Sequence, residues 1–133
     1  MNTESESIRE LFTEWIPLSM VRGRPSCIPH KTGLYVFRFT TGNFGRLAGE
    51  SDIVYIGSSE DLNERIVTNY LKGQGGETTK RIHLHLIERG YIERIDVSFA
   101  VLPTAQEGRE TEKELLKQYE ADHHELPPWN RAE

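Results

Sequence analysis

The spacing of apolar residues divides the chain into helical and extended segments. An i, i+3, i+4, i+7 pattern predicts a helix over residues 5–16 that Pro17 ends. Residues 18–32 contain prolines and a glycine, and we expect an extended connector there. Aromatic and β-branched residues predict strands over 33–40, 52–59 and 92–102. Three further helices are predicted over 60–72, 78–89 and 105–124.

Local signals set the connections between these elements. Residues 41–51 contain three glycines and indicate a long loop, and we expect the two strands that it joins to pair antiparallel. If their register permits, Tyr35 and Tyr55 lie on the same face. The helix after the second strand is expected to be capped by Ser58 or Ser59, and the next helix to end at Gly90.

The resulting order, α-β-β-α-α-β-α, predicts an α+β domain in which helices flank a small three-stranded antiparallel sheet. A length of 133 residues fits one compact domain with its own core. Within it we distinguish an N-terminal helix and connector, residues 1–28, from the main domain, residues 29–133.

Composition sets few further limits. The single cysteine, Cys27, allows no internal disulfide and fits a reducing compartment. The polar N-terminus lacks the apolar region of a signal peptide, and no apolar run approaches the ~20 residues that span a bilayer. We therefore expect a cytoplasmic protein that does not contact membranes.

The net charge of −5 argues against nucleic-acid binding, but its distribution is uneven. Residues 15–49 contain no acid and carry the bases Arg22, Arg24, Lys31, Arg38 and Arg46, whereas acids predominate after residue 105. This segregation allows a positive face. A chance imbalance among solvated side chains explains it equally well.

Two charged residues interrupt apolar helical patterns. Glu112 completes the spacing of Leu115 and Tyr119, so it lies at the edge of a buried stripe, pairs with a buried Arg, or serves as a metal ligand or catalytic acid. Arg65 borders the stripe that begins at Leu62, so it reaches solvent, pairs with Glu112, or binds an anion such as phosphate.

Four motifs in order resemble the GIY-YIG nuclease family, and together they span residues 29–130. They are Gly33-Leu34-Tyr35; Tyr55-Ile56-Gly57 followed by Ser58-Ser59, Leu62 and Arg65-Ile66; Glu112-x-x-Leu115-Leu116-x-x-Tyr119; and Leu126-Pro127-Pro128-Trp129-Asn130. One tripeptide alone would be a weak signal. The four together identify the chain as a stand-alone, single-domain member of this family.

The resemblance implies the predicted fold and the hydrolysis of a DNA phosphodiester with one Mg²⁺ or Mn²⁺ per site. It further implies that Tyr35 and Tyr55 flank the attacking water, with Tyr35 as the favoured general base. In the same way, Arg65 would hold the phosphate and Glu112 the metal, while Asn130 would shape the site around the glutamate. A tyrosine with a pKa of ~10 acts as a base only where nearby cations favour phenolate; otherwise Tyr35 only orients the water.

This sequence departs from the family pattern at two positions. Asn69 occupies the place, four residues after the arginine, where many members have His, and Ser58 stands where some repair-type members have Lys. The identity of any auxiliary base or electrophile therefore stays open. His83, within an apolar arc, is interpreted as a semi-buried structural histidine, with phosphate contact as the alternative.

The partner we expect is DNA. Arg22, Arg24 and Arg46 lie in the connector and the long loop, where we expect contacts to the phosphate backbone rather than to base edges. This favours weak sequence specificity, or recognition of branched, nicked or flap DNA, in DNA repair or in a mobile element. An inactive binding or regulatory module and an enzyme acting on RNA or a nucleotide are the alternatives, and the oligomeric state is open.

Overall fold

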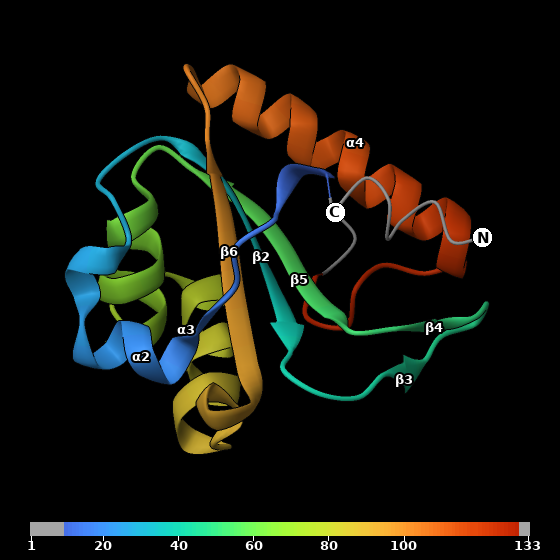
Figure 1. The fold of residues 1–133 in the computed structure, drawn as a ribbon, viewed down its shortest axis with the longest axis horizontal. Helices are drawn as coiled ribbons and strands as arrows, with labels where there is room; N and C mark the ends of the chain where they lie inside the picture. Colours follow the sequence, from blue (N-terminus) through green and yellow to red (C-terminus); the bar gives the residue numbers. More distant parts are fainter. Residues whose placement is uncertain (1–9, 131–133) are drawn as a thin grey trace.

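The computed structural model describes residues 10–130, in which a four-stranded antiparallel sheet forms the centre (Figure 1). Its strand order is β1-β6-β2-β5. These strands are β1 (Ile16–Pro17), β2 (Gly33–Phe39), β5 (Ile53–Ser59) and β6 (Ile95–Val101). A separate two-stranded ribbon, β3 (Phe44–Gly45) with β4 (Glu50–Ser51), lies within the predicted long loop.

The prediction of an α+β fold is confirmed, but that of three strands is wrong, because β1 adds a fourth. Ile16 pairs with Val97 of β6, and Pro17 pairs with Asp96. The missing N–H of Pro17 is tolerated because β1 lies at the edge of the sheet. The predicted helix over 5–16 lies partly outside the described residues; within them it ends at Leu11.

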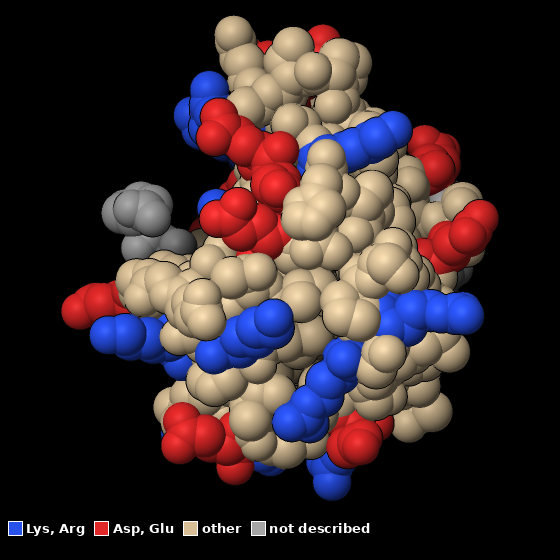
Figure 2. Space-filling model, turned by 90° about the vertical axis from the view of Figure 1, so that its left-hand side faces the viewer, with Lys and Arg blue, Asp and Glu red and all other residues tan. Residues whose placement is uncertain are grey.

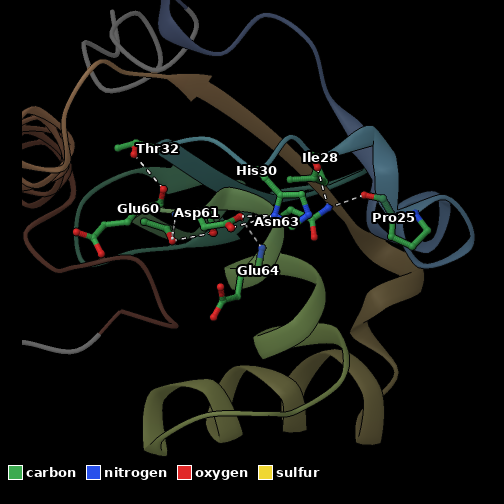
Figure 3. A network of polar contacts seen from close by, with 9 residues as sticks. Pro25, Ile28, His30, Thr32, Glu60, Asp61, Asn63 and Glu64 are labelled. Carbon is green, nitrogen blue, oxygen red and sulfur yellow. Dashed lines mark hydrogen bonds and ion pairs between the residues drawn. The ribbon is translucent and has the colours of Figure 1, made fainter.

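The connector predicted to be extended contains helix α2 (Leu18–Gly23) and a 3₁₀ turn, η1 (Pro25–Cys27). The spacing of the fully buried Leu18 and Val21 places both on one face of α2, a signal that the flanking prolines obscured. Asn63 then fixes the end of the connector by donating hydrogen bonds to the carbonyls of Pro25 (2.9 Å) and Ile28 (2.8 Å) (Figure 3).

The remaining helices begin after β5 and differ in their hydrogen-bond spacing. They are the π-helix η2 (Glu64–Leu71), α3 (Glu77–His83), which continues as the π-helical η3 (Leu84–Glu88), the 3₁₀ turn η4 (Tyr91–Arg94), and α4 (Ala105–His123). The helical segment begins at Leu62 and continues as η2; Asp61, rather than either predicted serine, caps it, because the Asp61 carboxylate accepts from the Glu64 N–H at 3.0 Å. Within residues 10–130, no helix combines the length and apolar character needed to cross a membrane.

The sheet separates two cores because the residues of β2 alternate between its faces. Leu34 and Val36 face α4 and pack with Leu115 and Tyr119. Tyr35 and Phe37 face the opposite layer, which contains α2, η2 and α3. Figure 1 shows α4 on one side of the sheet and α2 and α3 on the other. Alternate residues of β2 therefore pack either against α4 or against the layer of α2, η2 and α3.

Candidate active site

Three tyrosines converge on one face of the sheet, and we call Tyr35, Tyr55 and Tyr70 the tyrosine cluster. Antiparallel register pairs Phe37 with Tyr55, which places Tyr55 on the same face as Tyr35, as predicted, with ring centroids 6.0 Å apart. Tyr70 comes from η2, and its hydroxyl lies 2.5 Å from that of Tyr35 and 3.5 Å from that of Tyr55. Tyr35 is fully buried, whereas Tyr55 is 8% exposed.

Gly57 and Gly33 have no side chains because no space remains for them. A Cβ at Gly57 would lie 2.5 Å from both Cζ and Oη of Tyr35, the residue of β2 that pairs with Gly57. A Cβ at Gly33 would lie 2.2 Å from the carbonyl oxygen of Ala100. The glycines of the two tripeptides therefore permit close packing: the Tyr35 ring lies against Gly57, and the backbone of β6 lies against Gly33.

Arg65 extends from η2 toward the end of β5 and is half-buried. Its Nη1 donates to the carbonyl of Ser58 at 3.3 Å. Burial acts to lower the pKa of Arg65, but the nearby hydroxyls of Tyr35 and Tyr70 outweigh it and raise the pKa above its usual range. The site thus holds a permanent cation beside the tyrosine cluster.

Glu112 reaches the same region from α4. Its Oε1 accepts a hydrogen bond of 2.5 Å from the Ser58 hydroxyl. Burial raises the pKa of Glu112, while the Ser58 hydrogen bond and the charge of Arg65 act in the opposite direction. An open hollow of about 400 Å³ lies between the end of β5, η2 and α4. Its lining residues are Ser58, Ser59, Glu60, Arg65, Ala105, Arg109 and Glu112. The hollow thus places the carboxylates of Glu60 and Glu112 beside Arg65 and Arg109.

The donor set of this hollow fits a hard divalent cation that shares its ligands with a substrate. Within residues 10–130, no group of three or more His, Cys, Asp or Glu side chains could hold an ion by itself. Mg²⁺ commonly takes one or two carboxylates and completes its shell with waters and phosphate oxygens. Glu112, half-buried at an open hollow that Glu60 also lines, fits that arrangement and does not fit a closed structural metal site.

The tyrosines favour the protonated form. Burial raises the pKa of Tyr35 well above its ordinary value, and the neighbouring Tyr70 and Tyr55 add to the effect, while Arg65 lowers it. Burial likewise raises the pKa of Tyr55, with Tyr70 and Glu112 contributing in the same direction. Arg65 alone therefore does not generate a phenolate, and the protein by itself presents hydroxyl groups.

Asn130 lies at the edge of the sheet instead of in the hollow. Its side chain accepts from the Ile56 N–H at 3.0 Å and donates to the Ile56 carbonyl at 2.9 Å. The Trp129 N–H also donates to the carbonyl of Val54 at 2.9 Å. The final segment thus pairs with the open edge of β5 and fixes the backbone on both sides of Tyr55.

Several predicted contact residues have structural partners. Arg46 is only 11% exposed, donates to the carbonyl of Leu126 and lies 3.2 Å from the Glu125 carboxylate. The ring of His83 is bonded to the Tyr70 carbonyl at 2.8 Å. The Arg46 guanidinium thus anchors the C-terminal segment, and the His83 ring anchors the η2 backbone. Contacts of either residue with phosphate stay predictions.

The remaining predicted cations lie on the surface. Arg22 and Arg24 are exposed at the end of α2. The face shown in Figure 2 carries Lys and Arg interspersed with Asp and Glu, so this face is not uniformly positive. Charge alone therefore does not mark this face as a DNA-binding surface.

Two residues of the site are absent from the sequence-based prediction. Tyr70 continues the apolar spacing of Leu62 and Ile66, which is typical of a core residue, but its hydroxyl contacts both other tyrosines. Arg109 lies among the many charged residues of α4, and it lines the hollow one helical turn before Glu112. That i, i+3 spacing from Glu112 was the available signal for Arg109.

Comparison with known proteins gives two matches of different kinds. The sequence model of the GIY-YIG catalytic domain matches residues 31–125. The fold is similar to the GIY-YIG N-terminal endonuclease domain of UvrC from Thermotoga maritima, with 21% identity and a TM-score of 0.54, covering 85% of this chain and 97% of that one. Those structures are point mutants, including Tyr-to-Phe and Asn-to-Ala changes, bound to a catalytic divalent cation. No curated protein sequence matches significantly.

Proposed function

The chain belongs to the GIY-YIG nuclease family, and from that premise we propose that it is a divalent-metal-dependent endonuclease that hydrolyses DNA phosphodiester bonds. The observation that carries the proposal is that Arg65 of η2 and Glu112 of α4 line one hollow and interact with the tyrosine cluster, whose members come from β2, β5 and η2. Each supplies a different requirement of the reaction: a site for water, a cation for the phosphate and a ligand for the metal. Mg²⁺ or Mn²⁺ suits the oxygen donors.

Arg65 binds the scissile phosphate in this proposal. Its guanidinium is half-buried, and the Ser58 carbonyl fixes its orientation, so little reorganisation is needed when a phosphate enters the hollow. A preorganised cation stabilises the charge that develops on the phosphoryl oxygens more effectively than a solvated one. Arg109, exposed on the opposite wall, supplies a second contact to the DNA backbone.

Glu112 holds the divalent cation. When bound, such an ion supplies Lewis-acid stabilisation to the leaving oxygen. Burial already raises the pKa of this carboxyl, so binding of a cation would also relieve the cost of its charge. The Ser58 hydroxyl, where some relatives have a lysine, holds Oε1 and directs the carboxylate into the hollow.

Tyr35 and Tyr55 orient the attacking water, with Tyr35 accepting its hydrogen bond. Because the pKa of Tyr35 is raised, it removes a proton only when the cations of the complete site favour phenolate. Asn130 serves the site indirectly by holding the Ile56 backbone next to Tyr55. We propose modest sequence specificity, with branched, nicked or flap DNA as preferred substrates, because exposed arginines supply backbone contacts.

Plasmid nicking in Mg²⁺ or Mn²⁺ tests the proposal. The wild type should convert supercoiled plasmid to the open-circular form, and chelation of the metal should abolish conversion. Glu112→Ala should be inactive, whereas Glu114→Ala, an exposed glutamate on the same helix, should retain full activity. Equal behaviour of wild type and Glu112→Ala would exclude the enzyme and leave a DNA-binding or regulatory module.

A further inference from the structure

Glu60 is a second acidic residue at the hollow, and none of the four sequence motifs contains it. Along β5, Ile56 packs in the core next to α4, and the Ser58 hydroxyl bonds Glu112 of that helix. Side chains alternate along a strand, and Glu60, which directly follows β5, continues the parity of these two residues. Glu60 therefore extends toward the side of the sheet that α4 covers, where it lines the hollow with Arg109 and Glu112.

The backbone of the turn that carries Glu60 is held in place from the connector. The Thr32 hydroxyl donates to the Glu60 carbonyl at 2.9 Å (Figure 3). Two residues later in the turn, the Leu62 N–H donates to the Lys31 carbonyl at 2.9 Å. The start of the Glu60 side chain is thus fixed at the edge of the hollow, and only the side chain itself is free to rotate.

Glu60 differs from its neighbour Asp61 in what its carboxylate contacts. The Asp61 carboxylate lies 2.9 Å from Nδ1 of His30 and accepts from the Glu64 N–H at 3.0 Å. Within residues 10–130, no hydrogen bond or ion pair engages the Glu60 carboxylate, and Figure 3 shows its side chain directed away from the His30–Asp61 contact. The charge of Glu60 is therefore available to a ligand in the hollow.

The charges around the hollow give this carboxylate a use. Arg65 and Arg109 carry two positive charges, so an ionised Glu112 alone would leave the lining with one net positive charge. Such a lining repels a divalent cation until the phosphates of a substrate enter. With Glu60 ionised as well, the lining has no net charge. Glu60 thus removes the electrostatic penalty that the two arginines impose on metal binding.

We propose that Glu60 is the second carboxylate of the cation site, where it accepts hydrogen bonds from the waters around an ion held by Glu112. This inference rests on the proposed function, which supplies the ion. Mg²⁺ keeps several of its waters when one or two carboxylates bind it, and residues that hold the outer shell contribute to metal affinity. The hollow therefore takes up its cation before DNA enters.

Titration of the full chain with Mn²⁺ in the absence of DNA is the test, with free Mn²⁺ followed by electron paramagnetic resonance. The wild type should bind one Mn²⁺, and Glu112→Gln should lose this binding. Glu60→Gln, which keeps the size of the side chain and removes its charge, should weaken binding about tenfold or more. The matched control is Glu64→Gln: this exposed glutamate lines a neighbouring hollow of about 200 Å³ and not this one, and its affinity should stay within about twofold of wild type.

Plasmid nicking gives a second readout. Glu60→Gln should need about tenfold more Mn²⁺ for half-maximal nicking, and saturating Mn²⁺ should restore most of the rate. If Glu60 instead only repels DNA phosphates, Glu60→Gln should bind DNA more tightly and keep the Mn²⁺ affinity of the wild type.

Two results would overturn the inference while the nuclease function stands, provided that the wild type nicks plasmid. One is an unchanged Mn²⁺ affinity in Glu60→Gln, and the other is a wild type that binds Mn²⁺ only when DNA is present. A wild type that neither binds Mn²⁺ nor nicks plasmid would overturn the proposed function, and this inference with it. Circular dichroism spectra that match the wild type confirm that each variant is folded.

Discussion

A single methyl group added at Gly57 would test the packing that holds the tyrosine cluster. The backbone of Gly57 has no positive φ, so alanine introduces no backbone strain there. The cost is steric alone: the new Cβ would lie 2.5 Å from Cζ and Oη of Tyr35 and 3.0 Å from its Cε2. Atoms at van der Waals contact need 3.4 Å or more. The ring must therefore move by about 1 Å.

Tyr35 has little freedom to move in that way. It is fully buried, and its ring contacts those of Phe37, Tyr55 and Tyr70. Overpacking by one methylene typically costs about 1–3 kcal/mol. The displaced hydroxyl also loses its short bond to Tyr70, which adds about 1 kcal/mol. We expect Gly57→Ala to lower the free energy of unfolding by about 2–4 kcal/mol.

Urea unfolding and plasmid nicking together measure this effect. Gly57→Ala should unfold at lower urea and lose most of its nicking activity, even where it is fully folded. Gly45→Ala is the matched control, since nothing lies within 4 Å of its added Cβ, and it should change stability by less than about 1 kcal/mol. A Gly57→Ala protein with wild-type stability and activity would refute the steric account.

The remaining predictions concern single side chains. Arg65→Ala should reduce turnover by about 10²–10³-fold with little loss of stability, measured by single-turnover cleavage and thermal melting. Arg109→Ala should raise KM several-fold at unchanged kcat, and its DNA binding should depend less steeply on salt concentration. Asp61→Ala should cost about 1 kcal/mol in urea unfolding at pH 7, since the carboxylate caps η2. The Glu64 N–H and His30 lower the pKa of Asp61, so this stabilisation is present above about pH 4 and is lost as the pH falls through the folded pKa.

Each of these outcomes can fail. A stable, fully active Arg65→Ala would remove the phosphate role, and collapse of its fold would make Arg65 structural. An Arg109→Ala enzyme with unchanged KM would exclude that residue from the DNA path. A stability difference between wild type and Asp61→Ala that did not shrink between pH 7 and pH 3 would show that the cap does not depend on charge.

The sequence predicts those parts of the fold that depend on local patterns, such as the alternation of side chains along a strand. Tyr35 and Tyr55 share a face because the side chains of paired antiparallel strands alternate with a period of two, and the observed register confirms it. Three strands were predicted in their correct places, and Gly90 ends the helical segment with a positive φ of 74°. These features are local, so a short window of sequence is enough to specify them.

The missed features depend on tertiary contacts. Strand β1 exists because Ile16 pairs with Val97, some eighty residues away, a partner that local apolar spacing does not reveal. Arg46 donates to the Leu126 carbonyl and pairs with Glu125, because the fold places the C-terminal segment beside it. A helical period of 3.6 residues predicts Asn69 as the neighbour of Arg65 at the site, whereas in the π-helix η2 it is Tyr70 that contacts Tyr35. One residue of helical register thus decided which side chain joins the cluster.

The central claim, that Glu112 holds a divalent cation beside Arg65, is tested most directly by anomalous diffraction from crystals soaked in Mn²⁺. The account predicts one strong peak in the hollow, within about 2–2.5 Å of a Glu112 carboxylate oxygen, and its loss in Glu112→Ala. A peak at another site, or a peak that survives in Glu112→Ala, would contradict the account.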